Sequence, residues 1–174
     1  MRKLPAAHNS EITSLIVRQD ATGTKFLTGG LDGFIKLNDL EPQTLKCNFI
    51  SKAGISTACQ LSSPDQLALA TLNNDINLFN FATGNSMQKW YAHDEQITAL
   101  LYKDNILISC SLDQLMKFWD LSQAKISEPI SVQYEHEEAI YSADLHPTED
   151  LMASVDAEGN VILREIKCPN NLIA

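Results

Sequence analysis

Apolar and polar residues alternate in four short segments of this chain, each placed just after a predicted turn. In these segments every second position is apolar: Ile35 and Leu37, Ile76 and Leu78, Met116 and Phe118, and Val161 and Leu163. Alternation with a period of two is typical of a β-strand that buries one face. The pattern therefore predicts four strands that each pack one face into a core.

Further strands are predicted on both sides of each alternating segment. A strand rich in small and apolar residues precedes each turn, at 26–29, 67–71, 106–109 and 151–154. An earlier strand is predicted at 12–17, 55–59, 97–102 and 140–145, and a later one in three of the units at 44–49, 86–91 and 126–132. The connections are rich in Gly, Pro, Asp and Ser, which favour turns. The chain is therefore expected to fold as successive antiparallel meanders.

The four units are copies of one repeat. When they are aligned on the turn before the alternating segment, one column holds Asp32, Asn73, Asp113 and Glu158, at intervals of 41, 40 and 45 residues. Repeats of about 40 to 45 residues with four strands each are typical of β-propellers, in which sheets are arranged radially as blades. The sequence thus predicts an all-β fold.

The third copy carries the most specific motif, SCSLDQLMKFWD at 109–120. It resembles a WD40 repeat, a unit that begins near a Gly-His pair and ends in Trp-Asp. The resemblance implies a hydrogen-bonded tetrad of His93, Ser109, Asp113 and Trp119 within one blade. Such a set is physically reasonable, because a buried carboxylate needs donors that offset its loss of hydration.

The other copies depart from this tetrad. Two of them keep most of it: His8, Thr28 and Asp32 in the first, and His136, Ser154 and Glu158 in the fourth. The Trp column holds Asn38 in the first copy and Arg164 in the fourth. The second copy has no His at this position, with Leu69 and Asn73 in the Ser and Asp columns, so no tetrad is expected there.

The resemblance implies one WD40 repeat domain over residues 1–174, with four antiparallel four-stranded blades at about 7–50, 51–91, 92–134 and 135–168. WD40 propellers usually have seven blades, and four blades at about 51° each would cover only about 206° of a circle. We therefore expect a partial, open propeller. The missing blades could come from a longer parent chain, a second copy or a partner, and the parent chain is the source we favour.

Charge and composition exclude several classes of function. The net charge is −9, and the 13 basic residues are scattered, which argues against nucleic-acid binding. No apolar run approaches the length that spans a bilayer, and no apolar segment follows the basic residues near Met1. The expected location is cytoplasmic, with the nucleus as an alternative. The four cysteines have neither metal-ligand nor disulfide spacing and are interpreted as reduced.

The motifs of catalysis and metal binding are missing from the sequence. None of the four histidines, His8, His93, His136 and His146, has a His or Cys partner at ligand spacing. The turn carboxylates occur once per blade, whereas a glycosidase needs two across one cleft. Neither a nucleophile motif nor a phosphate-binding loop is present. The chain is therefore predicted not to be an enzyme and to use no metal or cofactor.

A binding surface remains as the predicted function, and the resemblance implies a protein-interaction scaffold or adaptor. The loop before the first strand and the turn after the second should share one face, with the candidate partner-binding residues Ser10, Glu11, Leu31, Lys52, Asp94, Glu95, Gln96, Leu112, Glu137 and Glu138. With Glu135, the acidic members would form a rim for a basic peptide, but ordinary solvated charge is the explanation that we favour for them.

The alternative function is structural. The chain would then complete a larger propeller in a multidomain trafficking, signalling or ubiquitin-ligase protein. Proteins with a BEACH domain followed by WD40 repeats are one example of such multidomain proteins. The segment DLSQAKISEPI at 120–130 resembles part of their WD40 region.

Overall fold

The computed structural model describes residues 8–20, 23–39 and 44–166, and in these ranges the chain forms strands, turns and bends without a helix. The first sheet consists of β1 (Ile12–Asp20), β2 (Gly23–Gly30), β3 (Phe34–Asp39) and β4 (Thr44–Phe49). The second consists of β5 (Ile55–Gln60), β6 (Gln66–Thr71), β7 (Asp75–Asn80) and β8 (Asn85–Tyr91).

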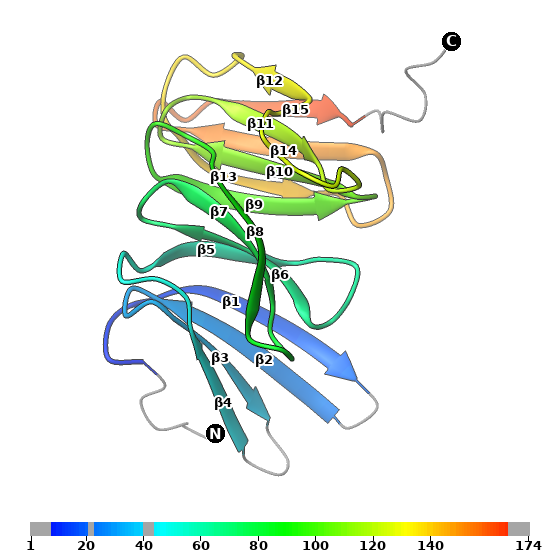
Figure 1. Ribbon diagram of the computed structural model, residues 1–174. Coiled ribbons are helices and arrows are strands. Elements are labelled where there is room, and N and C mark those ends of the chain that lie inside the picture. Colours follow the sequence, from blue (N-terminus) through cyan, green and yellow to red (C-terminus); the bar gives the residue numbers. More distant parts are fainter. Residues whose placement is uncertain (1–7, 21–22, 40–43, 167–174) are drawn as a thin grey trace, which may run out of the picture.

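The third sheet consists of β9 (Ile97–Lys103), β10 (Ile106–Ser111), β11 (Met116–Asp120) and β12 (Ser131–Gln133). The fourth consists of β13 (Ile140–Leu145), β14 (Leu151–Asp156) and β15 (Val161–Glu165). All pairs are antiparallel and sequential, and Figure 1 shows the sheets side by side in chain order as an open array. This architecture confirms the all-β, partial-propeller prediction.

Two details differ from the predicted four-stranded blades. The fourth sheet has three strands in the described part of the chain. In the third sheet the last strand was predicted at 126–132, but β12 is shorter and begins at Ser131. Pro129 explains this late start, because proline has no N–H to donate to a ladder. Ile126 lies outside the strand and is instead buried in the core.

Each first strand contains a register shift at the same place, next to its first isoleucine. The shifts lie between Ile12 and Ser14 in β1, between Ile55 and Thr57 in β5, and between Ile140 and Ser142 in β13, and β9 has the equivalent irregularity. In β1 and β9 the residue skipped by the shift is a threonine, Thr13 or Thr98. A bulge of this kind turns one side chain away from the ladder, and both threonines use the change to reach the next sheet.

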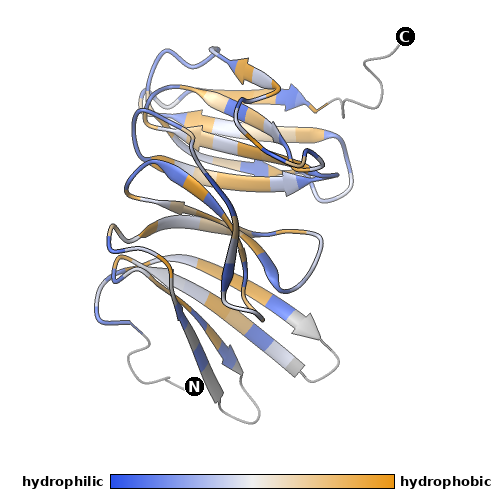
Figure 2. Ribbon diagram, in the orientation of Figure 1, coloured by the Kyte–Doolittle hydropathy of each residue, from blue (hydrophilic) through white to orange (hydrophobic). Residues whose placement is uncertain are grey.

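Three apolar cores lie between neighbouring sheets. Leu27, Ile35 and Leu37 of the first sheet face Leu67 and Leu69 of the second. The second core includes Trp90 and Trp119, whose ring centroids are 5.5 Å apart, and the third is built around residues such as Ile108, Phe118 and Met152. Figure 2 shows apolar and polar residues alternating along many of these strands. The alternating segments in the sequence therefore supply one wall of each core.

The two end sheets expose positions that are buried elsewhere in the array. On β1, Ile12, Leu15 and Val17 are 51%, 63% and 66% exposed, whereas the equivalent residues of later blades pack on the preceding sheet. On β15, Val161 and Leu163 are 63% and 76% exposed, whereas their equivalents on β3, β7 and β11 are core residues. Each end of the array therefore presents an apolar blade face.

Candidate functional site

A buried hydrogen-bond network joins the first three strands of the third blade. Nδ1 of His93 lies 2.9 Å from Oδ2 of Asp113, and Nε2 lies 2.7 Å from Oγ of Ser109. The indole Nε1 of Trp119 donates to the same Ser109 oxygen at 2.9 Å. A single tautomer, protonated at Nδ1, satisfies all four groups, because Nε2 then accepts the Ser109 hydroxyl proton. These contacts have the geometry of the tetrad that the WD40 resemblance implies.

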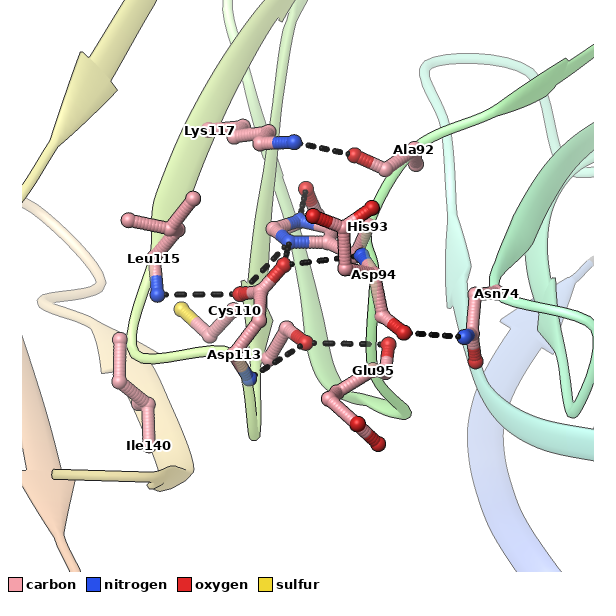
Figure 3. A network of polar contacts seen from close by, with 12 residues as sticks. Asn74, Ala92, His93, Asp94, Glu95, Cys110, Asp113, Leu115, Lys117 and Ile140 are labelled. Carbon is pink, nitrogen blue, oxygen red and sulfur yellow. Dashed lines mark hydrogen bonds and ion pairs between the residues drawn. The ribbon is translucent and has the colours of Figure 1, made fainter.

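The Asp113 carboxylate also shapes the backbone around it (Figure 3). It accepts the backbone N–H groups of Asp94 and Leu115, both at 3.1 Å. Burial alone would raise the pKa of Asp113, but the hydrogen bond from His93 and these two N–H groups outweigh burial and lower it. The carboxylate thus fixes the loop before β9 to the turn between β10 and β11.

The first blade repeats this arrangement with a different residue in the Trp column. Nδ1 and Nε2 of His8 lie 2.8 Å from Oδ1 of Asp32 and from Oγ1 of Thr28. Asn38 is buried in the Trp column, and its Nδ2 has no hydrogen-bond partner among the described residues. Gly30 makes room for the histidine, since a Cβ at this position would lie 2.6 Å from Nδ1 of His8.

The fourth blade corrects one sequence prediction, because its carboxylate comes from Asp156 and not from Glu158. Nδ1 of His136 lies 2.9 Å from Oδ2 of Asp156, and Nε2 lies 2.7 Å from Oγ of Ser154, while Glu158 is exposed. Asp156 pairs with Ile140 at the end of β14, in the place that Ser111 takes in the third blade. From there its Oδ1 accepts the N–H groups of both Glu158 and Asn160, so the turn needs no second carboxylate.

Two further features distinguish the fourth blade. The hydrogen bond from His136, with further contacts from Asn160, lowers the pKa of Asp156 to about 2 even though burial opposes the shift. Arg164, in the Trp column, forms an ion pair with Glu135. Glu135 was predicted to belong to the acidic rim, and this contact gives its charge a partner within the blade.

The second blade lacks the tetrad, as expected from its sequence. Leu69 is fully buried in the first core, and no histidine is present at this position. A smaller network takes its place: Oγ1 of Thr71 donates to Oδ1 of Asp75 at 2.9 Å, and Nζ of Lys89 lies 2.9 Å from Oδ2. Sequence reasoning missed Asp75 because it lies outside the aligned column.

The same backbone contact occurs at one edge of all four blades. The residue after the second strand donates its N–H to a carbonyl just before the first strand, in the pairs Leu31 to Glu11, Leu72 to Gly54, Leu112 to Gln96, and Ala157 to Ala139, at 2.9 to 3.2 Å. We call the edge formed by these loops and turns the top edge. It brings together the sequence-predicted partner-binding residues of each blade.

Most of the predicted partner-binding side chains on the top edge face solvent. Those exposed are Ser10, Glu11, Lys52, Asp94, Glu95, Gln96 and Glu137, and those partly buried are Leu31, Leu112 and Glu138. Sequence reasoning missed Leu72, which is 40% exposed. The signal was available, because Leu72 stands in the same repeat column as Leu31 and Leu112. Three blades thus carry a leucine at one equivalent position of the top edge.

Candidate metal ligands are dispersed among the described residues. No group of three metal-ligating side chains occurs in the described ranges. Burial raises the pKa of both Cys59 and Cys110 to about 12, so neither is a thiolate at neutral pH. Cys168 lies outside the described residues. No helix in the described part of the chain is long and apolar enough to cross a membrane.

Comparison with known proteins identifies the repeat. The family model described as "WD domain, G-beta repeat" matches residues 84–120, which span β8 to β11 and include His93, Ser109, Asp113 and Trp119. Residues 84–120 thus match one WD40 repeat. U3 small nucleolar RNA-associated protein 21 of Saccharomyces cerevisiae is 26% identical over 164 residues, which is 93% of this chain and 17% of the relative. Striatin-4 of Mus musculus is 31% identical over 103 residues, or 56% of this chain and 14% of the relative.

Solved structures support the fold of the whole array of sheets. The computationally designed protein Ika4 superposes with a TM-score of 0.73 at 19% identity, over 92% of this chain and 94% of Ika4. The designed protein Ika8 gives a TM-score of 0.74 at 19% identity, over 91% of this chain and 47% of Ika8. The chain also spans less than a fifth of the length of the two curated relatives named above.

Proposed function

We propose that this WD40-repeat chain is a non-catalytic scaffold that holds partner proteins on its top edge. The observation that carries the proposal is the recurring backbone contact between the turn after each second strand and the loop before each first strand. A rigid edge loses little conformational entropy when it binds, so its loops are suited to recognition. WD40 repeats generally act as protein-interaction scaffolds, and this supports the same interpretation.

The polar networks indicate that the buried histidines near the top edge stabilise the blades and do not take part in catalysis. His8, His93 and His136 are buried, and each is fully engaged by an aspartate and a hydroxyl group. A general base must be within reach of a substrate proton, which these buried rings are not. The residues left for recognition are the exposed side chains between the networks.

The charge of the top edge favours a basic partner segment. Asp94, Glu95, Glu137 and Glu138 lie on the third and fourth blades, and Lys52 is the basic residue among the predicted contacts. Leu31, Leu72 and Leu112 add apolar surface beside this charge. A basic segment with spaced apolar side chains matches both features, since complementary charge increases the rate and the specificity of association. An intracellular location, in the cytoplasm or the nucleus, is part of the proposal.

The proposal is tested by measuring fluorescence anisotropy of labelled peptides titrated with the chain. A basic amphipathic peptide should bind, and an acidic peptide of the same length and apolar content should not. Reversing Glu95, Glu137 and Glu138 to Lys should weaken binding at least tenfold. The matched control reverses Glu128, Asp144 and Glu149, which are exposed and lie outside the top edge. Equal affinity of both triple variants would contradict the proposal.

A second function, completion of a larger propeller, is favoured by the apolar end faces. Ile12, Leu15 and Val17 at one end and Val161 and Leu163 at the other occupy positions that pack on another blade elsewhere in the array. The length of the curated relatives supports further blades in a parent chain. Expression with the flanking coding sequence should then raise the melting temperature and remove self-association. No change in either quantity would argue against this function.

A further inference from the structure

The outer edge of the fourth blade differs from the outer edges of the other three. In the first three blades the third strand pairs with an outer strand, which is β4, β8 or β12. In the described part of the fourth blade, β15 is itself the last strand of the sheet. A strand in this position presents N–H and C=O groups to which another extended segment can pair. The edge of β15 therefore has the backbone groups that a further strand would need.

The hydrogen bonds of the fourth blade show which residues of β15 direct their backbone groups outward. Asp156 donates its N–H to the carbonyl oxygen of Asn160 at 3.2 Å, so Asn160 faces β14. Backbone direction alternates along a strand of an antiparallel sheet, so Ile162 also faces β14, whereas Val161 and Leu163 face outward. In the third blade β12 pairs with the two equivalent residues of β11. Two residues of β15 are thus aligned to pair with an added strand.

The other outer edges carry features that hinder the addition of a strand. β4 and β8 each contain a lysine, Lys46 or Lys89, and β12 has only three residues. Lysines and very short strands are two devices that keep a sheet edge from pairing with another chain. β15 has five residues and no lysine, and its basic residue, Arg164, forms an ion pair within the blade. Its outward residues Val161 and Leu163 are apolar and are 63% and 76% exposed.

The charge of the fourth blade indicates what kind of segment fits this edge. Residues 135–166 contain nine acidic residues and one basic residue, a formal charge of −8 in a chain whose net charge is −9. Asp144, Ala153 and Leu163 lie in one row across the sheet, so Asp144 is on the same face as Leu163. Glu165, two residues after Leu163, lies on that face as well, and both carboxylates are exposed. Complementary charge therefore favours a basic segment.

We propose that the outer edge of β15 binds an extended segment of another protein, in which apolar and polar residues alternate and a lysine or arginine stands at each end. The segment adds a fourth antiparallel strand through main-chain hydrogen bonds to Val161 and Leu163. Its apolar side chains lie beside those of Val161 and Leu163, and one basic end lies beside Glu165. Because binding uses a strand edge and not the loops of the top edge, it does not depend on the proposed scaffold function.

The test is hydrogen exchange of the full chain, resolved to single amides, with and without the peptide KTVTVTK. Without peptide, the amides of Val161 and Leu163 should exchange quickly, and that of Ile162, which faces β14, should exchange slowly. Saturating peptide should slow exchange at Val161 and Leu163 at least tenfold and leave Ile162 unchanged. Strong protection of Val161 and Leu163 before peptide is added would overturn the proposal, because another part of the chain or a second copy would then occupy the edge.

Peptide variants, measured by fluorescence anisotropy, separate the two parts of the recognition. KTVTPTK lacks one N–H that faces β15, and ETVTVTE keeps the strand pattern with reversed charge, so each should bind at least tenfold more weakly than KTVTVTK. Equal affinity of KTVTVTK and either variant would overturn the proposal, as would the absence of saturable KTVTVTK binding up to about 2 mM.

Chain variants separate binding from folding. Leu163→Lys places on β15 the kind of lysine that β4 and β8 carry, so it should lower KTVTVTK affinity at least tenfold and leave the melting temperature unchanged, because the side chain is exposed. Glu165→Lys should lower affinity at least threefold. Leu15→Lys is the matched control, since Leu15 is 63% exposed on β1 at the other end of the array, and it should bind like the unmodified chain. Equal affinities of Leu163→Lys and Leu15→Lys would overturn the proposal.

Discussion

Oγ1 of Thr98 donates a hydrogen bond to the carbonyl oxygen of Ile140, 2.7 Å away on the next blade. Thr13 makes the equivalent bond to Ile55 at 2.6 Å. Both threonines are released from their own ladder by the register shift at the start of the first strand. The bulge therefore has a structural use: it frees a hydroxyl group that joins one blade to the next.

Thr98→Val should destabilise the fold, because valine keeps the shape of the side chain but leaves the Ile140 carbonyl oxygen without this donor. The expected loss in the free energy of unfolding is about 1 to 2 kcal/mol. Urea denaturation followed by tryptophan fluorescence measures it, since Trp90 and Trp119 lie in the core between the second and third blades. Thr83→Val, at an exposed position, is the control and should cost less than about 0.5 kcal/mol. Equal effects of the two changes would contradict the role of the bulge.

Asp113→Ala should lower stability before it affects any partner. The change removes the acceptor of His93 and of two backbone N–H groups. The expected loss is about 3 kcal/mol, because hydrogen bonds to a charged group contribute more than neutral ones. Differential scanning calorimetry measures the shift. Asn73→Ala is the matched control, since Asn73 holds the same column in the blade without a tetrad. A variant that kept its melting temperature and lost a partner would overturn the structural assignment of Asp113.

Stability should fall in acid because the carboxylates of the networks have lowered pKa values. The pKa of Asp156 is lowered to about 2, and those of Asp32 and Asp113 are lowered as well, where the contacts with His8 and His93 outweigh burial. A group with a depressed pKa in the folded state contributes stability above its unfolded pKa and loses it as the pH falls through the folded value. The loss should therefore begin near pH 4 and continue toward pH 2.

Urea midpoints measured between pH 6 and pH 2.5 test this dependence. In Asp156→Asn, one of the three carboxylates that contact a buried histidine is gone, so the midpoint should fall less steeply with acid than in the unmodified chain. Asp144→Asn is the control, because Asp144 is exposed and belongs to none of the three networks. Parallel curves for Asp156→Asn and the unmodified chain would show that the His136 contact does not set the acid limit.

The fold could be predicted from the sequence because a period of two is a strong local signal and it recurs in every copy. Ile35 and Leu37 alternate with polar residues in the same way as Met116 and Phe118, so the strands follow from the pattern. The Trp-Asp motif at 119–120 identified the family from a single copy. The open array of sheets was also predicted correctly, because four copies are too few to close a ring of seven blades.

The sequence pattern did not predict contacts that depend on how far a side chain reaches. Glu158 stands in the aspartate column, yet Asp156 reaches His136 from two residues earlier and also closes the turn. Asp75 joins Thr71 and Lys89 in a network that no column predicts. The partner-binding role of the top edge stays a prediction.

The apolar end faces predict that the isolated chain self-associates. Leu15 on β1 and Leu163 on β15 are 63% and 76% exposed at positions that pack on a neighbouring blade within the array. End repeats need polar faces to stay soluble as monomers, so light scattering should give a mass above 19.3 kDa that rises with concentration. Combining Leu15→Lys with Leu163→Lys should return the mass toward that of one chain. Met87→Lys changes an exposed apolar residue of β8 outside the end faces and should leave the association intact. A monomeric unmodified chain with a cooperative melt would contradict the prediction, since it would mean that both faces are stable in water without another blade.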